Sequence, residues 1–235
     1  MNSEMQSKIS TLGVSLGLSR PPIGLAFVEQ PPDDIGRPDV DVPAACSFWR
    51  MAEQEVFYAA EDEHFNCPLG VMTMGFQIPA DRQEEARAIV DTMCELEYIT
   101  PEEANIIPSV SGDHKGIVYG PLAQMPVEPD VAIFVCKPSQ AMLLAEASGG
   151  VTWTGEGITA FGRPACAIVP IALSSMNTSM SVGCVGFRVY TGISDEELLI
   201  AVPRNQIQKI VDKLGTTVSA NGVLEEFHTQ RRSDL

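Results

Sequence analysis

The sequence has little positive charge, and this scarcity limits the classes of partner. Its 235 residues include 15 lysines and arginines against 31 aspartates and glutamates, which gives a formal net charge of −16. Nucleic acids and anionic membrane surfaces are bound through lysine and arginine. We therefore expect neither as a partner, and we interpret most of the acidic residues as a solvated surface.

Long apolar runs are missing as well. No stretch approaches the ~20 apolar residues of a membrane-spanning helix. The N-terminal segment lacks the basic start and the continuous apolar core of a secretory signal. It fits an amphipathic helix instead, with Met5, Ile9 and Leu12 near one face. We expect a cytoplasmic protein, in which the six cysteines stay reduced and serve as core residues, redox centres or metal ligands.

The common catalytic signatures are also absent from the sequence. There is no H-E-x-x-H zinc motif, no phosphate-binding G-x-x-x-x-G-K-[ST] loop and no G-x-S-x-G nucleophile elbow. The glycines of 154–162 begin a dinucleotide-binding pattern, but the third glycine is misplaced. With only three histidines in the chain, hydrolytic metal chemistry is not expected.

The pattern of apolar residues predicts a chain that mixes helices and strands. We expect a single α/β or α+β domain over residues 1–235, with a central mixed sheet flanked by helices. Asp81 is placed to cap one helix and Gly215 to close another. The predicted strands are 21–30, 115–122, 130–137 and 165–173, and the predicted helices are 46–60, 80–93, 138–148, 204–215 and 223–232. A mobile, glycine-rich loop is expected over 149–164.

Two parts of the chain resemble each other weakly. In residues 20–95 and again in 160–215, a proline–cysteine segment precedes a cysteine–glycine turn and then a helix containing "IVD". The matches are short, so chance and an ancient duplication both remain open. A duplication predicts two halves, packed about a pseudo-twofold axis, at which four cysteines can converge.

Those four cysteines are the candidate site. Cys46, Cys67, Cys166 and Cys184 each lie near a proline or a glycine, whereas Cys94 and Cys136 are interpreted as small core residues. Four thiolates suit zinc or an iron–sulfur cluster. However, no C-x-x-C pair preforms half of such a site, so tertiary structure must assemble the ligands. Packing alone, or a reversible thiol pair, are the alternatives.

Further candidates lie near these cysteines in the sequence. His64 could act as a ligand or a base, although a solvated histidine in an acidic turn is the favoured interpretation, and His114 is interpreted as a surface residue. Trp153 is either a lid over a flat apolar ligand or a loop anchor. Arg188 either holds an anionic group beside Cys184 or pairs with a nearby acid.

Several segments are similar to one known family. They include "NCPLG" (66–70), "EPDVAIFVCKPSQAMLLAEA" (128–147), "GRPACAIVPIAL" (162–173) and "SVGCVGFRVYTGISDEELLIAVP" (181–203). Together they resemble the family catalogued as domain of unknown function 169, which is mostly archaeal and anaerobic bacterial and has no assigned function. The resemblance implies a redox-active centre at its recurring cysteines, which correspond here to Cys46, Cys67, Cys166 and Cys184. An anaerobic distribution favours an oxygen-sensitive cluster over zinc.

Three hypotheses follow. The first is a cytoplasmic redox protein whose four cysteines hold an iron–sulfur cluster, with Arg188 and the loop around Trp153 shaping access for a small molecule or an electron-transfer partner. The second is a non-catalytic module that binds a flat organic cofactor or a hydrophobic ligand, with cysteines that only pack. The third is a zinc-stabilised domain. A homo-oligomer is compatible with all three.

Overall fold

The computed structural model describes residues 3–149, 159–161 and 164–233. Its centre is a seven-stranded sheet in the order β2-β3-β1-β4-β7-β6-β5. Neighbouring strands are antiparallel except for β5 and β6, which pair in parallel. The strands are β1 (Ile23–Val28), β2 (Phe57–Ala60), β3 (Gly116–Pro121), β4 (Val131–Cys136), β5 (Thr159–Phe161), β6 (Ser179–Ser181) and β7 (Leu198–Pro203). The fold is α+β with a mixed sheet, as expected.

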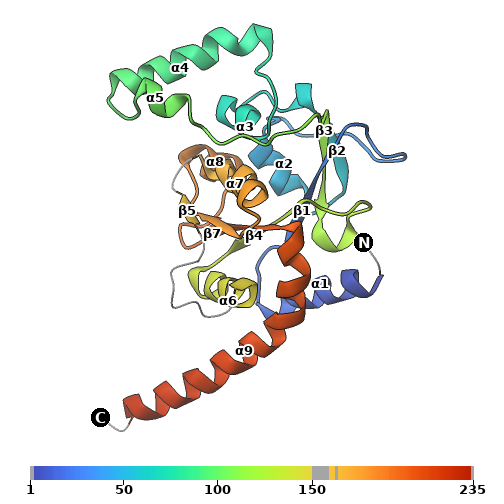
Figure 1. Ribbon diagram of the computed structural model, residues 1–235, viewed down its shortest axis with the longest axis vertical. Helices are drawn as coiled ribbons and strands as arrows, with labels where there is room; N and C mark the ends of the chain where they lie inside the picture. The colour runs from blue at the N-terminus through green and yellow to red at the C-terminus, as the bar shows by residue number, and fades with distance from the viewer. Residues whose placement is uncertain (1–2, 150–158, 162–163, 234–235) are drawn as a thin grey trace.

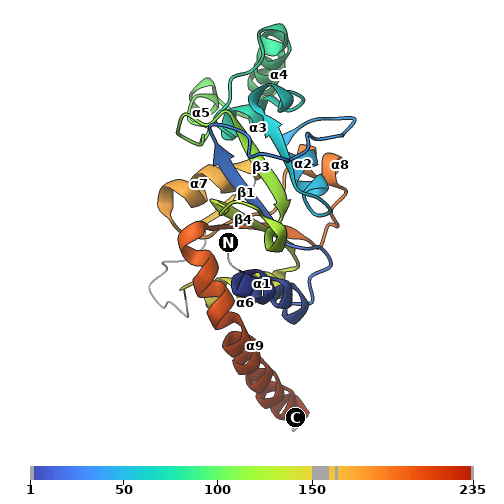
Figure 2. The ribbon, with the colours of Figure 1, turned by 90° about the vertical axis from the view of Figure 1, so that its right-hand side faces the viewer.

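Helices cover both faces of the sheet (Figure 1). One face carries α2 (Ala45–Met51), α3 (Pro68–Thr73), α7 (Ile168–Ser175) and α8 (Val185–Thr191). The other carries α1 (Ser3–Ser15), α6 (Pro138–Gly149) and the first half of α9 (Arg204–Ser233). Two further helices, α4 (Gln83–Glu95) and α5 (Pro101–Ala104), stand at the end of the molecule opposite the C-terminus of α9 (Figures 1 and 2). Short 3₁₀ turns complete the chain: η1 (Glu61–Glu63), η2 (Ala80–Arg82), η3 (Leu122–Gln124) and η4 (Ala165–Ala167).

Alternation along the strands explains the two layers. In β4, Val131 and Ile133 point into the core under α2, α7 and α8, whereas Ala132 and Phe134 point into the core under α1, α6 and α9. A strand buried on both faces is apolar at every position, and the apolar run of β4 lies within the strand predicted over 130–137. All four of these residues are at most 2% exposed. The sheet is therefore sandwiched between two helical layers.

The strand registers follow a twofold relation. In the β1–β4 pair, Ile23 lies opposite Ile133 and Leu25 opposite Val131, so a twofold axis passes between the strands near Gly24. The axis relates Ile23 to Val131. Ile23 pairs with Pro121 of β3, and Val131 pairs with Pro203 of β7, so the axis also relates Pro121 to Pro203. Both outer strands thus end in a proline at equivalent positions. The related elements are β1-α2-β2-α3-β3 and β4-α7-β6-α8-β7, which occupy 23–121 and 131–203. Their origin by duplication remains a prediction.

Two predicted elements differ from the structure. The helix predicted over 46–60 ends at Met51, and 57–60 forms β2, because the aromatic and small residues there pair with β3. The strand predicted over 165–173 is wrong: η4 and α7 occupy it, and Pro170 lies in the first turn of α7, where a missing N–H costs little. A short apolar run does not by itself distinguish a strand from a buried helix.

The ends of two helices also differ. The predicted stop at Gly215 is wrong, since α9 runs through it to Ser233, and the segment predicted separately over 223–232 is part of the same helix. The second half of α9 projects away from the body of the molecule (Figures 1 and 2). Asp81 lies in η2 and does not cap α4, which begins at Gln83. In the part of the chain that the structure describes, no helix is both long and apolar enough to cross a membrane.

Candidate functional site

The four candidate cysteines all lie where a helix begins. Cys46 is in the first turn of α2, and Cys67 and Cys184 are the N-cap residues of α3 and α8. Cys166 lies in η4, which leads directly into α7. Helix α2 packs on α8, and α3 packs on both α2 and η4. Four separate turns of the chain therefore meet on one face of the sheet.

The thiols are close enough to influence one another electrostatically. Burial raises the pKa of Cys46 well above its ordinary value, and charge on Cys166, Cys67 and Cys184 raises it further. Burial also raises the pKa of Cys166 to about 12, against a hydrogen bond from Thr73 that lowers it. Each of the six pairs among the four cysteines interacts in this way. The thiols of Cys46, Cys67 and Cys166 are thus protonated at neutral pH unless a ligand stabilises the thiolates.

A backbone amide points at one of the two outer sulfurs. The N–H of Phe187 donates a hydrogen bond to Cys184 Sγ over 3.4 Å. The pKa of Cys67 is raised by burial, and the nearby backbone of Gly70 and Leu69 opposes that rise. N–H groups that point at sulfur favour the thiolate over the thiol. Cys46 and Cys166 are the inner pair, at 3% and 2% exposed, and Cys67 and Cys184 are the outer, half-buried pair.

A buried tyrosine and histidine lie beside the inner cysteines. His64 Nε2 is 2.9 Å from the Tyr119 hydroxyl, and both side chains are fully buried. His64 Nδ1 is 2.7 Å from the carbonyl oxygen of Ala60, which can only accept, so Nδ1 carries the proton and Nε2 accepts from Tyr119. Burial raises the pKa of Tyr119, and the charges of Cys46 and Cys166 raise it further.

The solvated interpretation of His64 is therefore wrong. The acidic side chains of η1 keep to the outside, and the ring turns inward, where it packs against Phe48 at 4.9 Å and Phe76 at 4.7 Å between ring centroids. His114 does lie in a surface turn, as predicted, but its ring is half-buried. Its Nε2 hydrogen-bonds to the carbonyl of Met74 over 2.8 Å, and the ring packs on Phe27 at 4.9 Å and on Phe76 at 5.1 Å between centroids.

The remaining candidates are Arg188, Trp153, Cys94 and Cys136. Arg188 donates to the carbonyls of Val182 and Ser194 over 2.7 and 3.1 Å, and it pairs with Asp195 over 3.4 Å, so its guanidinium ties the turns on either side of α8 together. Trp153 lies outside the described residues. Cys136 is buried at the end of β4, as expected for a core residue, whereas Cys94 in α4 is half-buried and lies outside the core clusters of the described residues.

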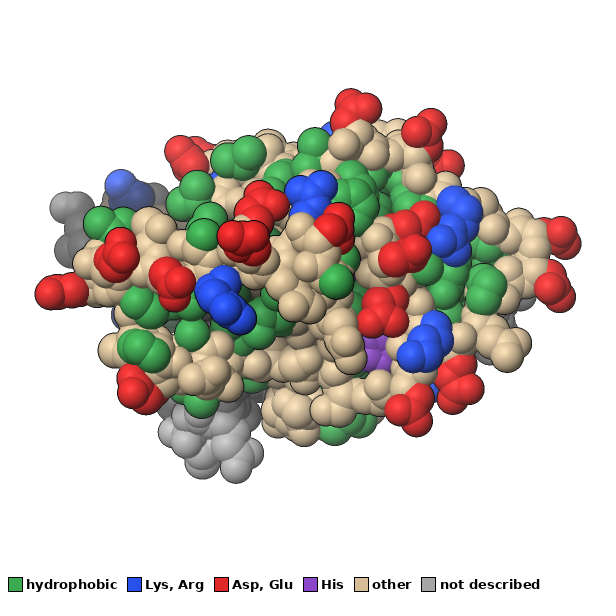
Figure 3. Space-filling view, turned by 90° about the horizontal axis from the view of Figure 1, so that it is seen from above, with side chains coloured by type: hydrophobic (Ala, Val, Ile, Leu, Met, Phe, Trp, Pro, Cys, Tyr) green, Lys and Arg blue, Asp and Glu red, His purple; other side chains and the backbone are tan. Residues whose placement is uncertain are grey.

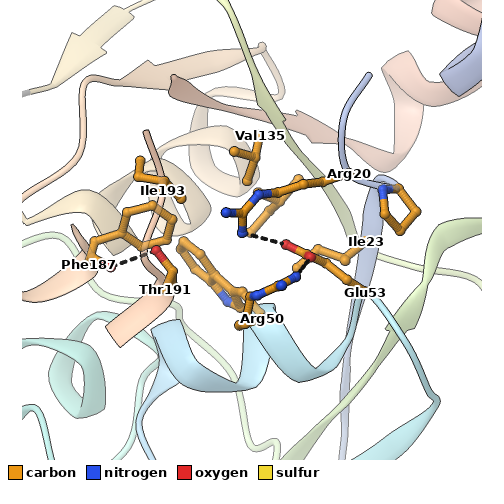
Figure 4. Close-up of a pocket in the computed structure, with 11 residues that line it drawn as sticks. Arg20, Ile23, Arg50, Glu53, Val135, Phe187, Thr191 and Ile193 are labelled. Atoms are coloured by element: carbon orange, nitrogen blue, oxygen red, sulfur yellow. Dashed lines mark hydrogen bonds and ion pairs between the residues drawn. The ribbon is translucent and has the colours of Figure 1, made fainter. Parts of the chain in front are cut away.

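One turn further along α2 and α8, a small cavity lies between these helices and strands β1 and β4 (Figure 4). It is about 10 Å³ in volume, enough for about one water molecule, and Trp49 and Phe187 line it, with ring centroids 5.7 Å apart. Glu53 bridges two arginines at its mouth, accepting from Arg20 over 3.2 Å and from Arg50. The indole N–H of Trp49 has no hydrogen-bond partner among the described residues.

The donor set fits a sulfur-bound centre in its chemistry, but the thiols do not close on one ion. Within residues 3–149, 159–161 and 164–233, no three side chains of His, Cys, Asp or Glu form a group that could hold a metal ion. What the sequence missed is the pair His64 and Tyr119. The only available signal was one tyrosine in an otherwise aliphatic strand, and nothing local linked it to a histidine 55 positions away.

Comparisons with known proteins agree on a family. The chain is 29% identical over 182 residues to a protein of Methanocaldococcus jannaschii named "Uncharacterized protein MJ0308", a match that covers 72% of this chain and 75% of that protein. No solved structure matches the chain. The model of the family domain of unknown function 169, described as "Uncharacterised ArCR", matches residues 11–213. The chain belongs to this family.

Proposed function

We propose that this protein is a cytoplasmic redox protein in which Cys46, Cys67, Cys166 and Cys184 hold an iron–sulfur cluster. The observation that carries the proposal is the meeting of four cysteines, from four separate helix starts, on one face of the sheet. When bound, such a cluster supplies one-electron transfer, either to a protein partner or to a small molecule.

A cluster of several irons demands less close an approach of the sulfurs than a single ion does. Thiolates bound to one zinc ion each lie about 2.3 Å from the metal and so crowd together. A cluster spreads its cysteine ligands over separate iron atoms and therefore takes sulfurs that are farther apart. The four thiols influence one another electrostatically. A cluster is therefore the centre we propose, and zinc is the alternative that metal analysis separates from it.

The surrounding residues would tune such a centre. N–H groups directed at sulfur, as Phe187 presents to Cys184, stabilise negative charge on a cluster. The core residues around Cys46 and Cys166 exclude water from the inner side. The outer pair leaves one side open, since Cys67 also lines a groove at the surface. Electrons would therefore enter and leave on the side of Cys67.

The test is metal analysis of protein purified without oxygen. We expect iron and acid-labile sulfide in equal amounts, with broad visible absorption. Each single change of Cys46, Cys67, Cys166 or Cys184 to serine should lower bound iron by at least about tenfold, since loss of even a supporting contact costs 10–100-fold in metal affinity. Cys94→Ser is the matched control and should bind iron normally.

Other outcomes would overturn the proposal. One zinc per chain, lost in the same four variants, would make the domain zinc-stabilised. Colour that persists in the quadruple serine variant would point to an organic cofactor. Protein that binds neither metal nor chromophore would leave the four cysteines as core packing.

A further inference from the structure

A groove opens beside the cysteines, at the end of the molecule formed by α4 and α5. Its volume is about 690 Å³, within the range of small-molecule sites. Its walls come from four parts of the chain: α3 and the turn before it, the segment from Ile78 through α4, the end of α5, and α8. Cys67 and Tyr190 lie on the wall opposite α4.

The apolar face of α4 faces this groove and not the core. Ala86, Ile89, Val90 and Met93 are spaced as the apolar stripe of an amphipathic helix. All four line the groove, and Ile89 remains 52% exposed. On α8, across the groove, Val185 is 79% exposed. A concave site lined mainly by apolar side chains with few polar groups is typical of ligand-binding pockets.

The charge of the groove differs from that of the rest of the chain. Arg87 is the one charged residue among the described residues that line it, although the chain carries 31 aspartates and glutamates against 15 lysines and arginines. Arg87 is exposed and has no hydrogen bond, ion pair or ring contact with any other described residue. Seen from above α4, acidic side chains outnumber basic ones on the surrounding face, with apolar side chains between them (Figure 3). An apolar groove with one free cation, inside an acidic surface, is complementary to an amphipathic anion.

We propose that the groove binds a single-chain amphiphile with an apolar body and one carboxylate. The hydrocarbon chain lies along the apolar face of α4, and the carboxylate pairs with Arg87. Because Cys67 lines the same groove, a bound ligand lies next to the outer pair of cysteines. The inference stands without the metal centre, since it rests on the walls of the groove alone.

The test is calorimetric titration of the full chain with dodecanoate below its critical micelle concentration. We expect saturable binding at one site. Shortening the chain to octanoate should weaken binding by about fourfold for each methylene removed. Dodecanol, with the same chain and no charge, should bind about fivefold more weakly than dodecanoate, which is the difference expected for one partly exposed ion pair.

Two variants locate the site. Arg87→Gln should weaken dodecanoate about fivefold and leave dodecanol unchanged. The matched control is Arg232→Gln on the projecting part of α9, which makes the same charge change and should alter neither titration. Ile89→Asp, at a side chain that is half exposed and so tolerant of change, should abolish dodecanoate binding by placing a carboxylate in the groove.

The proposal is overturned if dodecanoate does not bind, or if Arg87→Gln and Arg232→Gln affect it equally. It is also overturned if sedimentation shows a dimer that Ile89→Asp dissociates, because a second copy of the chain then covers the groove. Metal content, measured on the same samples, reports the cysteine centre separately. Failure of one proposal can thus be distinguished from failure of the other.

Discussion

The buried histidine predicts a specific loss of stability in mild acid. Burial lowers the pKa of His64 to about 3 from an ordinary value of 6.5. The hydrogen bond to the Ala60 carbonyl opposes this lowering, and charge on His114 adds to it. The unfolded chain therefore binds one more proton than the folded chain between these two values. Stability from this residue is complete above pH 6.5 and declines as the pH falls towards 3.

The magnitude follows from proton linkage. One proton contributes about 1.36 kcal/mol per pH unit once the histidine of the unfolded chain is fully protonated. At pH 6.5 it is half protonated, so the fall from pH 6.5 to 4.5 costs about 2 kcal/mol. For 235 residues the entropy of unfolding is about 0.5 kcal/mol per degree, which makes this loss about 4 °C in Tm. Carboxylates also titrate in this range, so the wild-type profile alone does not isolate the histidine.

A difference between two variants isolates it. His64→Gln keeps a donor for Ala60 and an acceptor for Tyr119 but does not titrate. We expect it to be less stable than the wild type at pH 7.5 and to lose about 2 kcal/mol less between pH 6.5 and 4.5. Urea unfolding of metal-free, reduced protein measures both profiles. His228→Gln, at an exposed histidine of α9, should run parallel to the wild type. If the stability of His64→Gln changes with pH in parallel to that of the wild type, the histidine is not held neutral in the core and the reasoning fails.

Three further changes test the packing. Gly75 has φ +85°, and a Cβ there would lie 2.3 Å from the carbonyl oxygen of Val110, so Gly75→Ala should cost at least about 2 kcal/mol in urea unfolding. Gly17→Ala is the control: φ is +62° but no atom lies within 4 Å of the added Cβ, and the expected cost is about 1 kcal/mol. Leu144→Ala, at a fully buried side chain between the sheet, α6 and α9, should lose about 2–5 kcal/mol by the same assay. Removal of residues 222–235 should shift Tm by less than about 2 °C in calorimetry, because side chains on that half of α9 are exposed; a larger shift would mean that the projecting helix is packed in solution.

Local sequence predicted the parts of the fold whose signals are local. β4 and α6 follow from an uninterrupted apolar run of strand length and from a proline that starts the next helix. In contrast, α7 was mistaken for a strand because every position over 165–173 is apolar, whichever structure buries it. Whether such a segment is helix or strand depends on what it packs against, and that is set by the sheet and not by its own residues.

The same distinction holds for the site. Neighbouring prolines and glycines singled out Cys67, Cys166 and Cys184. A proline follows Cys67 and starts α3, another proline precedes η4, which contains Cys166, and glycines lie near Cys184, the N-cap of α8. Those neighbours are themselves features of helix starts. His64 gave the opposite signal, because its acidic neighbours face solvent while its own ring reaches Tyr119 on a distant strand. Contacts of that kind depend on strand pairing far along the chain.

The twofold relation of the sheet explains why four cysteines meet at all. The relation that takes β1 onto β4 takes α2 onto η4 and α7, and α3 onto α8. It therefore pairs Cys46 with Cys166, both almost fully buried, and Cys67 with Cys184, both half-buried N-cap residues. Packing obeys the same relation, since α2 contacts α8 and its counterpart η4 contacts α3. Each half contributes one inner and one outer thiol, and neither half alone holds more than two. A centre with four thiols can exist only where the two halves face each other, so the sheet that joins them at β1 and β4 is also what assembles the site.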